Sequence, residues 1–298
     1  MGLKHLLTVN DLKKEDVDAI MKMASSIHQG NYESLKSTKI LATLFFESST
    51  RTKLSFQSAM YKLGGQIIDL PSNSSKIKGE SDADTIQTIS KYADILVLRH
   101  PKNDIMEYLA KYSDVPVINA GDGSNQHPTQ ALIDVYTIKQ YNSKKEELTI
   151  MFTGDLYYSR TIRSLLELLK LDEFNLDFKL HLISTNKYYP IDKIINISDT
   201  KFTCIDKDQI DQYIENVDVL YMTRLQEERY IGREIDSRKF IMTKELLNKM
   251  KADAIIMHPL PRNEELPEEI DSNYRAKYFQ QVKNGLFIRM ALIKNIID

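Results

Sequence analysis

Short apolar runs alternate with amphipathic stretches along most of the 298 residues, and this alternation constrains the fold more than any other feature. Each run is largely apolar and bounded by polar or turn residues, which is typical of a buried strand. Strands that alternate with helices form parallel sheets with helices on both faces, so we predict an α/β fold. The predicted strands are 39–46, 94–98, 116–120, 148–153, 178–183, 218–222 and 254–258, and the predicted helices are 11–27, 52–63, 82–92, 129–140, 160–170, 243–251 and 275–296.

The chain is too long for one ordinary domain and has about the length of two. A second series of strands and helices restarts at Leu148, so we place the boundary inside the helix that starts near His127. We expect one domain over 1–130 together with the last helix, at about 282–298, and a second domain over 131–281. Long helices join the two, each of which is built on a mostly parallel sheet.

Charge and composition exclude several classes of function. The net charge of −2 argues against general binding of nucleic acid. No apolar run reaches membrane-spanning length, and the start of the chain lacks the pattern of a signal peptide. The single cysteine, Cys204, fits a reducing cytoplasm. The histidines are scattered without metal-ligand spacing, so we expect no catalytic metal and no cofactor.

The segment FFESSTRT, residues 45–52, has the composition of an anion site. An apolar strand ends, hydroxyl residues and one arginine follow, and a helix then begins. The first turn of a helix offers free N–H groups and the positive end of its dipole. Helix capping explains one of the residues Ser49 and Thr50, but not these two together with Arg51 and Thr52. The spacing alone does not decide between an anion site and helix capping.

Three further arginines follow apolar strands: Arg99, Arg160 and Arg224. Ligands of open α/β sheets sit beyond the carboxyl ends of the strands, so these side chains and Arg51 are candidates for one cleft. Four arginines exceed the charge that one phosphate needs. The ligand is therefore a polyanion or two anions side by side.

Two other strand ends carry polar or constrained residues. GDGSNQHPTQ, residues 121–130, places His127 and Gln130 one turn apart after a glycine-rich turn. MHPLPR, residues 257–262, follows the last strand with two prolines, and the bond between residues 260 and 261 is a candidate for the cis form. A structural role for a lone histidine is the alternative at His127.

The chain resembles the aspartate carbamoyltransferase family over nearly its whole length. The motifs that carry the resemblance occur in the family's order: FFESSTRT, SKIKGES, LRHP, GDGSNQHPTQ, GDLYYSRT, YMTRLQEER and HPLPR. The resemblance implies transfer of the carbamoyl group of carbamoyl phosphate to L-aspartate, an early step of pyrimidine biosynthesis. It also implies that the first domain binds carbamoyl phosphate and the second binds aspartate.

The resemblance further implies a role for each matched residue. The phosphate of carbamoyl phosphate is held by Ser49, Thr50, Arg51, Thr52 and Arg99. The carbamoyl oxygen faces Thr52, Arg99 and His127, and the carbamoyl amino group faces Gln130 and the backbone carbonyls of Pro259 and Leu260. The carboxylates of aspartate are taken by Arg160 and Arg224, with Gln226 close by. Ser74 binds carbamoyl phosphate and Lys78 binds aspartate and assists catalysis, and both reach into the site of a neighbouring chain.

Shared sites imply a homotrimer. The sequence contains no regulatory domain of its own, so we expect allosteric control to come from a separate regulatory chain or from cooperativity between sites. The sequence departs from the family's pattern at Ser159, where glycine is usual, and a positive φ there would strain the serine.

Three alternatives remain at this stage. A carbamoyltransferase with ornithine as acceptor conflicts with the paired Arg160 and Arg224, which suit an anionic acceptor. A nicotinamide-dependent dehydrogenase lacks its G-x-G-x-x-G turn after every predicted strand. A catalytically inactive binding subunit conflicts with the presence of every expected catalytic side chain.

Overall fold

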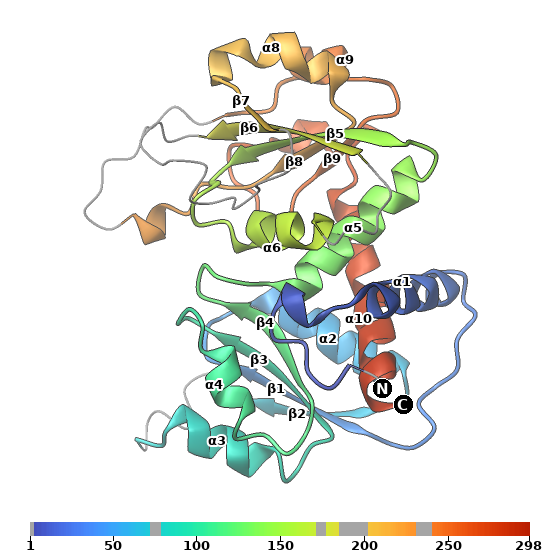
Figure 1. Ribbon diagram of the computed structural model, residues 1–298, viewed down its shortest axis with the longest axis vertical. Helices are drawn as coiled ribbons and strands as arrows, with labels where there is room; N and C mark the ends of the chain where they lie inside the picture. Colours follow the sequence, from blue (N-terminus) through green and yellow to red (C-terminus); the bar gives the residue numbers. More distant parts are fainter. Residues whose placement is uncertain (1–2, 72–78, 171–176, 185–201, 231–239) are drawn as a thin grey trace. The chain divides into compact units, whose positions relative to one another are not determined.

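The computed structural model describes residues 3–71, 79–170, 177–184, 202–230 and 240–298 (Figure 1). The chain divides into two compact units. Unit 1 consists of Met1–Tyr136 and Lys283–Asp298, and unit 2 of Thr137–Val282. The chain therefore passes between the units twice, once inside helix α5 (Pro128–Asn142) and once inside helix α10 (Tyr278–Ile297).

Unit 1 is built on a parallel sheet with the strand order β2-β1-β3-β4. The strands are β1 (Ile40–Phe45), β2 (Gln66–Leu70), β3 (Ile95–His100) and β4 (Val117–Asp122). The helices are α1 (Lys14–His28), α2 (Thr50–Lys62), α3 (Asp82–Ile89) and α4 (Met106–Ala110), with the parts of α5 and α10 given above. The chain leaves β1 toward β2 and then returns across β1 to β3, so the direction of winding reverses beside β1.

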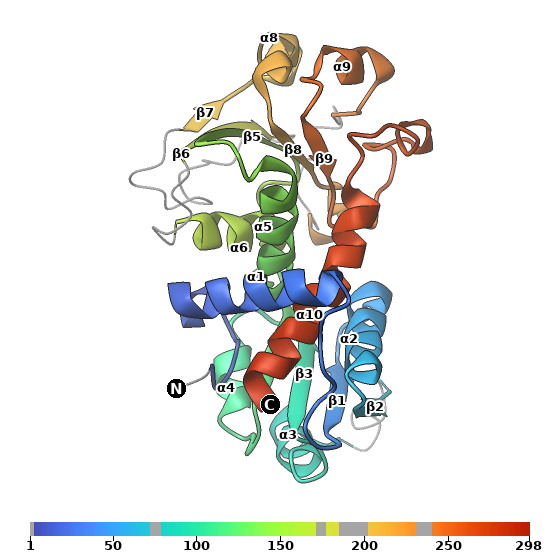
Figure 2. The same ribbon diagram turned by 90° about the vertical axis from the view of Figure 1, so that its right-hand side faces the viewer.

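Helices cover both faces of this sheet. Right-handed crossovers in opposite directions place their helices on opposite faces. Accordingly, α3 and α4 lie on one face, and α1, α2 and α10 lie on the other (Figures 1 and 2). On the second face α1 and α10 lie side by side, since the rings of His28 and Phe287 stack with centroids 4.6 Å apart.

Unit 2 is built on a parallel sheet with the order β7-β6-β5-β8-β9. Its strands are β5 (Glu147–Gly154), β6 (Asp177–Ser184), β7 (Phe202–Cys204), β8 (Val219–Met222) and β9 (Ile255–Met257). Helix α6 (Arg160–Leu169) lies on one face, and α8 (Ile210–Tyr213) and α9 (Lys244–Lys249) lie on the other (Figure 1). Winding reverses here beside β5. Short 3-10 helices are η1 (Val9–Asp11), η3 (Lys207–Gln209), η4 (Ile214–Asn216), η5 (Glu227–Arg229) and η6 (Glu268–Ile270).

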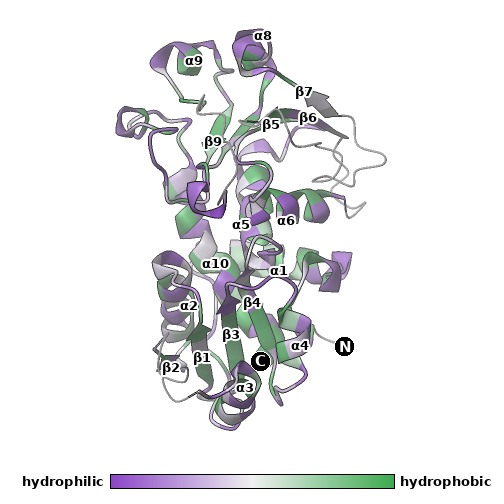
Figure 3. Cartoon of the chain, turned by 90° about the vertical axis from the view of Figure 1, so that its left-hand side faces the viewer, coloured by the Kyte–Doolittle hydropathy of each residue, from purple (hydrophilic) through white to green (hydrophobic). Residues whose placement is uncertain are grey.

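Each sheet is buried between its helices. In unit 1, Leu44, Leu96 and Leu98 pack with Ile86 of α3 and Met106 of α4. Strands β3 and β4 are accordingly apolar along most of their length (Figure 3). Burying a side chain of this size stabilises the fold by about 1.5–3 kcal/mol. In unit 2, strand residues of β5, β8 and β9 form a second core with α8 and α9.

The seven predicted strands are all present, as are the seven predicted helices, and the predicted α/β fold is confirmed. Strand β3 extends two residues beyond the predicted run, so Arg99 lies inside the strand. The sequence reading missed β2, β7, α4 and α8, which are short. No helix in the described ranges is both long and apolar enough to cross a membrane.

Candidate functional site

The carboxyl ends of β1 and β3 lie side by side in unit 1. Phe45 pairs with Arg99 in the parallel register, and the N–H of Phe46 donates to the carbonyl of Arg99 over 2.8 Å. The loop that leads from β1 into α2 therefore starts beside Arg99. This is the point at which the winding of the sheet reverses, where open α/β sheets bind their ligands.

Helix α2 begins in this loop with the hydroxyl residues that the sequence singled out. Ser49 is the N-cap by position and is extended (φ −157°, ψ 97°), yet within the described residues its side chain caps no N–H of the first turn. Ser81, at the start of α3, does cap its helix. Thr50 and Arg51 are exposed, and Thr52 is buried. The Ser49 hydroxyl and the helix terminus are therefore both suited to an anion.

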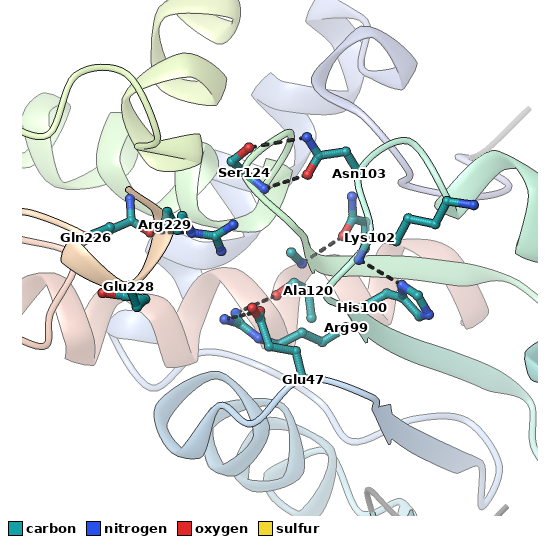
Figure 4. A network of polar contacts seen from close by, with 12 residues as sticks. Glu47, Arg99, His100, Lys102, Asn103, Ala120, Ser124, Gln226, Glu228 and Arg229 are labelled. Atoms are coloured by element: carbon teal, nitrogen blue, oxygen red, sulfur yellow. Dashed lines mark hydrogen bonds and ion pairs between the residues drawn. The ribbon is translucent and has the colours of Figure 1, made fainter. Parts of the chain in front are cut away.

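Arg99 is a buried cation at the end of β3. Its Nη2 lies 2.7 Å from Oε2 of Glu47, and its Nη1 donates to the carbonyl of Ala120 over 3.2 Å (Figure 4). These contacts from the neighbouring β1–α2 loop and β4 fix the direction of the guanidinium. Glu47 also offsets part of its charge, so an anion at Arg99 competes with a carboxylate.

A buried carboxylate, Asp122, shapes the loop that carries His127. Asp122 accepts hydrogen bonds from the backbone N–H groups of Asp104 and Gln126, each over 3.0 Å. His127 follows and is buried, with its Nδ1 3.3 Å from the Thr129 hydroxyl. The loop is thus fixed by side-chain contacts, and the histidine is held directly before α5.

Gln130 lies in the first turn of α5 and is half-buried. Its backbone N–H donates to the carbonyl of His127 over 2.9 Å. Its side-chain Nε2 donates to Oδ1 of Asp134, one turn further along, over 2.8 Å. Unit 1 therefore brings together seven of the predicted site residues at one edge of its sheet: Ser49, Thr50, Arg51, Thr52, Arg99, His127 and Gln130.

In unit 2, Arg160 is the first residue of α6. Ser159 precedes it as the N-cap, with φ −77°, and its hydroxyl accepts from the N–H of Ile162 over 3.5 Å. The serine therefore needs no positive φ, and the strain considered for it does not arise. Arg160 is presented at the carboxyl end of β5.

Asp155 ties the loop before α6 to the loop after β8. Its carboxylate accepts from the N–H groups of Tyr158 (2.9 Å) and Gln226 (3.0 Å) and from the hydroxyl of Tyr230 (2.9 Å). Burial raises the pKa of Asp155, and these hydrogen bonds oppose the rise. The network fixes the backbone from which Arg160 and Arg224 project.

Arg224 makes a forked ion pair with Glu228. Its Nη1 donates to Oε2 over 3.0 Å, and its Nη2 contacts Oε1. Glu228 raises the pKa of Arg224, against the effect of burial. Gln226 accepts on Oε1 from Nε of Arg229 over 3.0 Å (Figure 4). Arg224 and Gln226 thus lie beyond the end of β8, where Glu228 holds Arg224 and Arg229 holds Gln226.

The loop after β9 carries Pro259 and Leu260. Leu260 has φ 55°, and the bond that follows it is cis, as the sequence suggested. Its N–H donates to Nδ1 of His258 over 2.9 Å, and Nε2 of His258 lies 3.1 Å from Oε1 of Glu265. Nδ1 accepts, so Nε2 carries the proton and donates to Glu265. Burial opposes ionisation of Glu265, yet the bond from His258 helps to hold the pKa of Glu265 below its usual value.

Ser74 and Lys78 lie outside the described residues. Unit 2 brings Arg160, Arg224, Gln226, Pro259 and Leu260 to the carboxyl ends of β5, β8 and β9. The sequence reading missed the residues that orient the predicted site residues in the two units, namely Glu47 and Asp122 in unit 1 and Asp155 and His258 in unit 2. The signal for two of them was the repeated Gly-Asp pair directly after an apolar run.

Comparisons with known proteins cover nearly the whole chain. Residues 4–140 match the family model described as aspartate/ornithine carbamoyltransferase, carbamoyl-P binding domain. Residues 146–296 match the model of the Asp/Orn binding domain of the same family. Aspartate carbamoyltransferase catalytic subunits from Wigglesworthia glossinidia brevipalpis and Methanococcus vannielii are 41% and 42% identical, over 99% and 98% of this chain and 97% of each relative.

Solved structures agree with these matches. Aspartate transcarbamoylase from Trypanosoma cruzi in complex with carbamoyl phosphate aligns with a TM-score of 0.89 and 33% identity, over 100% of this chain and 97% of that one. The same enzyme in complex with N-(phosphonacetyl)-L-aspartic acid aligns with a TM-score of 0.87 and 34% identity, over 100% and 96%.

Proposed function

The chain belongs to the aspartate/ornithine carbamoyltransferase family, and on that premise we propose that it transfers the carbamoyl group of carbamoyl phosphate to the amino group of L-aspartate. The products are N-carbamoyl-L-aspartate and phosphate, and the reaction is an early step of de novo pyrimidine biosynthesis. The observation that carries the proposal is the start of α2, which follows the strand pair of Phe45 and the buried cation Arg99 and where the Ser49 hydroxyl caps no first-turn N–H in the described part of the chain. The relatives whose names specify aspartate support the choice of acceptor.

We propose that unit 1 holds carbamoyl phosphate. Ser49, Thr50, Arg51 and Thr52 bind its phosphate at the N-terminus of α2, with Arg99 as a second cation. Thr52, Arg99 and His127 direct hydrogen atoms toward the carbamoyl oxygen. Gln130 accepts from the carbamoyl amino group, as do the backbone carbonyls of Pro259 and Leu260, which belong to unit 2.

We propose that unit 2 holds aspartate through Arg160 and Arg224, with Gln226 as a neighbouring polar contact. Two arginines match the two carboxylates of aspartate. They repel the cationic side chain of ornithine. In the described structure Arg224 pairs with Glu228, so the substrate carboxylate must replace or join that carboxylate.

The chemistry requires no covalent enzyme intermediate, cofactor or metal. The amine nitrogen of aspartate attacks the carbamoyl carbon, the bond from carbon to the phosphate oxygen breaks, and a proton passes from the nitrogen to the departing phosphate. Holding two reactants in line contributes roughly 7–11 kcal/mol to lowering the barrier. A donor aimed at the developing oxyanion contributes about 3–4 kcal/mol.

Assembly and location belong to the same proposal. We propose a homotrimer in which Ser74 and Lys78 complete the site of a neighbouring chain, on the ground of the resemblance to the family, whose motif SKIKGES contains Lys78. The proposed source of any allosteric control is a separate regulatory chain or cooperativity between sites. The single cysteine supports a reducing, cytoplasmic location.

Steady-state assays with carbamoyl phosphate and either aspartate or ornithine test the proposal directly. We expect product when the acceptor is aspartate and none when it is ornithine. Product with ornithine but not with aspartate contradicts the proposal. The variant Arg51→Ala should lose roughly 100- to 1,000-fold of turnover, the effect of removing one preorganised donor, while circular dichroism stays unchanged. Lys62→Ala, at the exposed last turn of the same helix, is the control and should keep full activity. Near-normal turnover of Arg51→Ala would show that the phosphate lies elsewhere.

A further inference from the structure

The orientation of the side-chain amide of Gln130 is set by Asp134. Its Nε2 donates to Oδ1 of Asp134 over 2.8 Å, and Asp134 is fully buried four residues further along α5. An ionised carboxylate only accepts hydrogen bonds, so the amide must turn its NH₂ group toward Asp134. The other end of the same planar amide, the oxygen Oε1, is thereby directed away from Asp134.

Arg289 of α10 is a cation that interacts electrostatically with Asp134. Arg289 is itself buried, and it is fixed in place by the Ser55 hydroxyl, which accepts from Nη1 over 2.9 Å, and by the ring of Phe56, 5.0 Å from its guanidinium carbon. Burial lowers the pKa of Arg289 to about 10 against the attraction of Asp134, so the group remains a cation near neutral pH.

The packing around Arg289 leaves little freedom for another arrangement. Gly285 lies one turn before it in α10, and a Cβ atom at this glycine would come within 2.7 Å of Nη1 of Arg289. The absence of a side chain at residue 285 therefore gives the guanidinium its space. Gln130, Asp134, Ser55 and Arg289 all belong to unit 1.

We propose that Asp134, balanced by Arg289, is a positioning residue that fixes Gln130 as an acceptor and so makes the site select an acyl phosphate that bears an amino group. The inference rests on the proposed function, in which Gln130 faces the amino group of carbamoyl phosphate. An amide with its oxygen toward the ligand accepts from NH₂. A flipped amide would set its own NH₂ against that of the substrate.

Acetyl phosphate is the probe that isolates this contact. It carries a methyl group where carbamoyl phosphate carries NH₂ and is otherwise of similar shape and charge. A methyl group cannot satisfy an oriented acceptor, which is why sites built for a donor reject analogues that lack it. The ratio of the two dissociation constants therefore reports the orientation of Gln130. Ionisation of the phosphate, which the two ligands share, cancels in the ratio.

Asp134→Asn tests the proposal in the full-length protein. Asparagine keeps the shape of the side chain but offers both a donor and an acceptor, so it no longer forces one orientation on Gln130. We expect the preference for carbamoyl phosphate over acetyl phosphate to fall roughly 3- to 10-fold, the effect of one neutral hydrogen bond. The affinity for inorganic phosphate should stay within about twofold, because the phosphate contacts are not altered. An unchanged ratio, or an equal loss of affinity for all three ligands, overturns the proposal.

Gln130→Glu tests the same contact and leaves the buried pair of Asp134 and Arg289 intact. In its protonated form the new acid donates to Asp134 and keeps its carbonyl oxygen toward the ligand, as the amide does. When it ionises, it faces Asp134 as a like charge. We expect the ratio to be near that of the wild type at low pH and to change as pH rises, through a titration that the wild type lacks, because Asp134 repels the ionised acid. A ratio that does not depend on pH overturns the proposal, and this profile decides the matter if Asp134→Asn does not fold.

Failure of the proposed function and failure of the positioning role give different experimental results. If the wild-type protein does not carbamoylate aspartate, the proposed function itself is wrong. If it does, and neither variant changes the ratio as described, only the positioning role of Asp134 is wrong.

Discussion

Asp122 and Asp155 occupy corresponding places in the two units. Each follows a glycine with positive φ, Gly121 (φ 115°) and Gly154 (φ 100°), at the carboxyl end of a strand. Each carboxylate is buried and collects N–H groups from the loop that presents predicted site residues. The glycine lets the chain turn sharply enough for the carboxylate to point back into its own loop. The loops that carry the predicted site residues are therefore held by residues outside that predicted set.

Gly154 provides a test of this arrangement. A Cβ atom at this position would lie 1.9 Å from the carbonyl oxygen of Thr223, the residue before Arg224. Gly154→Ala therefore combines the cost of a positive φ, about 1–2 kcal/mol, with a clash that moves backbone. We expect a clear fall in the midpoint of thermal unfolding, measured by circular dichroism, and a higher KM for aspartate.

Gly30→Ala is the matched control for that substitution. Gly30 also has a positive φ, 83°, but a Cβ atom there meets nothing within 4 Å. Gly30→Ala should lower the stability only by the cost of the positive φ, about 1–2 kcal/mol, and should leave the KM for aspartate unchanged. Equal effects of the two substitutions would show that the approach to Thr223 is unimportant.

A cluster of charges joins the starts of three neighbouring strands in unit 2. Asp218, directly before β8, accepts from Lys145 (2.6 Å) before β5, from Lys251 (2.8 Å) before β9, and from the N–H of Thr149 (2.9 Å). Burial opposes ionisation of Asp218, but the lysines and the backbone donor together hold its pKa below the usual value. The cluster lies at the amino ends of the strands, opposite the edge that carries the site. Its role is therefore to align the strands.

Removing the carboxylate of this cluster should destabilise unit 2. Asp218→Asn leaves Lys145 and Lys251 without their shared partner, and we expect a loss of roughly 1–3 kcal/mol in the free energy of unfolding by urea. Asp253→Asn is the control, because Asp253 is exposed and contacts Lys145 at the rim, and it should cost less than about 1 kcal/mol. Similar losses for both would contradict the role assigned to Asp218.

The same cluster predicts how stability depends on pH. The folded-state pKa of Asp218 is depressed, so its contribution is fully present above the ordinary value of 3.8 and is lost as pH falls through the lower folded value. The wild type and Asp218→Asn should therefore converge in stability below pH 3.8. A difference that persists in strong acid would place the effect in packing rather than in charge.

Most of the strands that the sequence predicted have two buried faces. Strands β1 and β3 read as continuous apolar runs because helices cover both sides. Strand β2 is at the edge of its sheet and only partly buried, and β7 is an edge strand of three residues, so neither has enough apolar residues to be recognised. Helices α4 and α8 have five and four residues, too few for a periodic pattern.

The candidate site follows the same rule. Residues placed by position along the chain, such as Arg99 at the end of a strand or Ser49 before a helix, were predictable because strand ends and helix starts are local features. The residues that fix the orientation of these side chains were not predictable. Glu47 acts through an ion pair with Arg99, and Asp134 through its charge interaction with Arg289, 155 residues away, and such interactions leave no local pattern in one sequence.

At the scale of the whole molecule, the predicted site residues fall into three groups. One group lies in unit 1, one in unit 2, and the third, Ser74 and Lys78, is proposed to act in a neighbouring chain. The chain crosses between the units only within α5 and α10. In the proposed site, the groups of unit 1 and unit 2 come from one chain and the third group comes from its neighbour. A defect in the third group can therefore be complemented only by a neighbouring chain in which that group is intact.

Mixing two inactive variants tests the proposed shared site. In a Lys78→Ala chain the chain's own groups are intact, and in a His127→Ala chain the loop offered to its neighbour is intact. A site formed between the first and the second contains every required side chain. Random assembly in a trimer gives this arrangement in about one quarter of the sites, so we expect up to about a quarter of the wild-type activity after coexpression.

A second mixture separates shared sites from a general effect of assembly. His127→Ala and Arg51→Ala both impair the group that a chain contributes to its own site, so no arrangement of these two chains restores a complete site. We expect no recovery in this mixture, and light scattering should give about three times the chain mass of 34.5 kDa for every sample. Recovery in both mixtures, or in neither, would contradict the view that Lys78 acts across chains. Recovery in the first alone would make the trimer, rather than the single chain, the unit in which the two substrates are held.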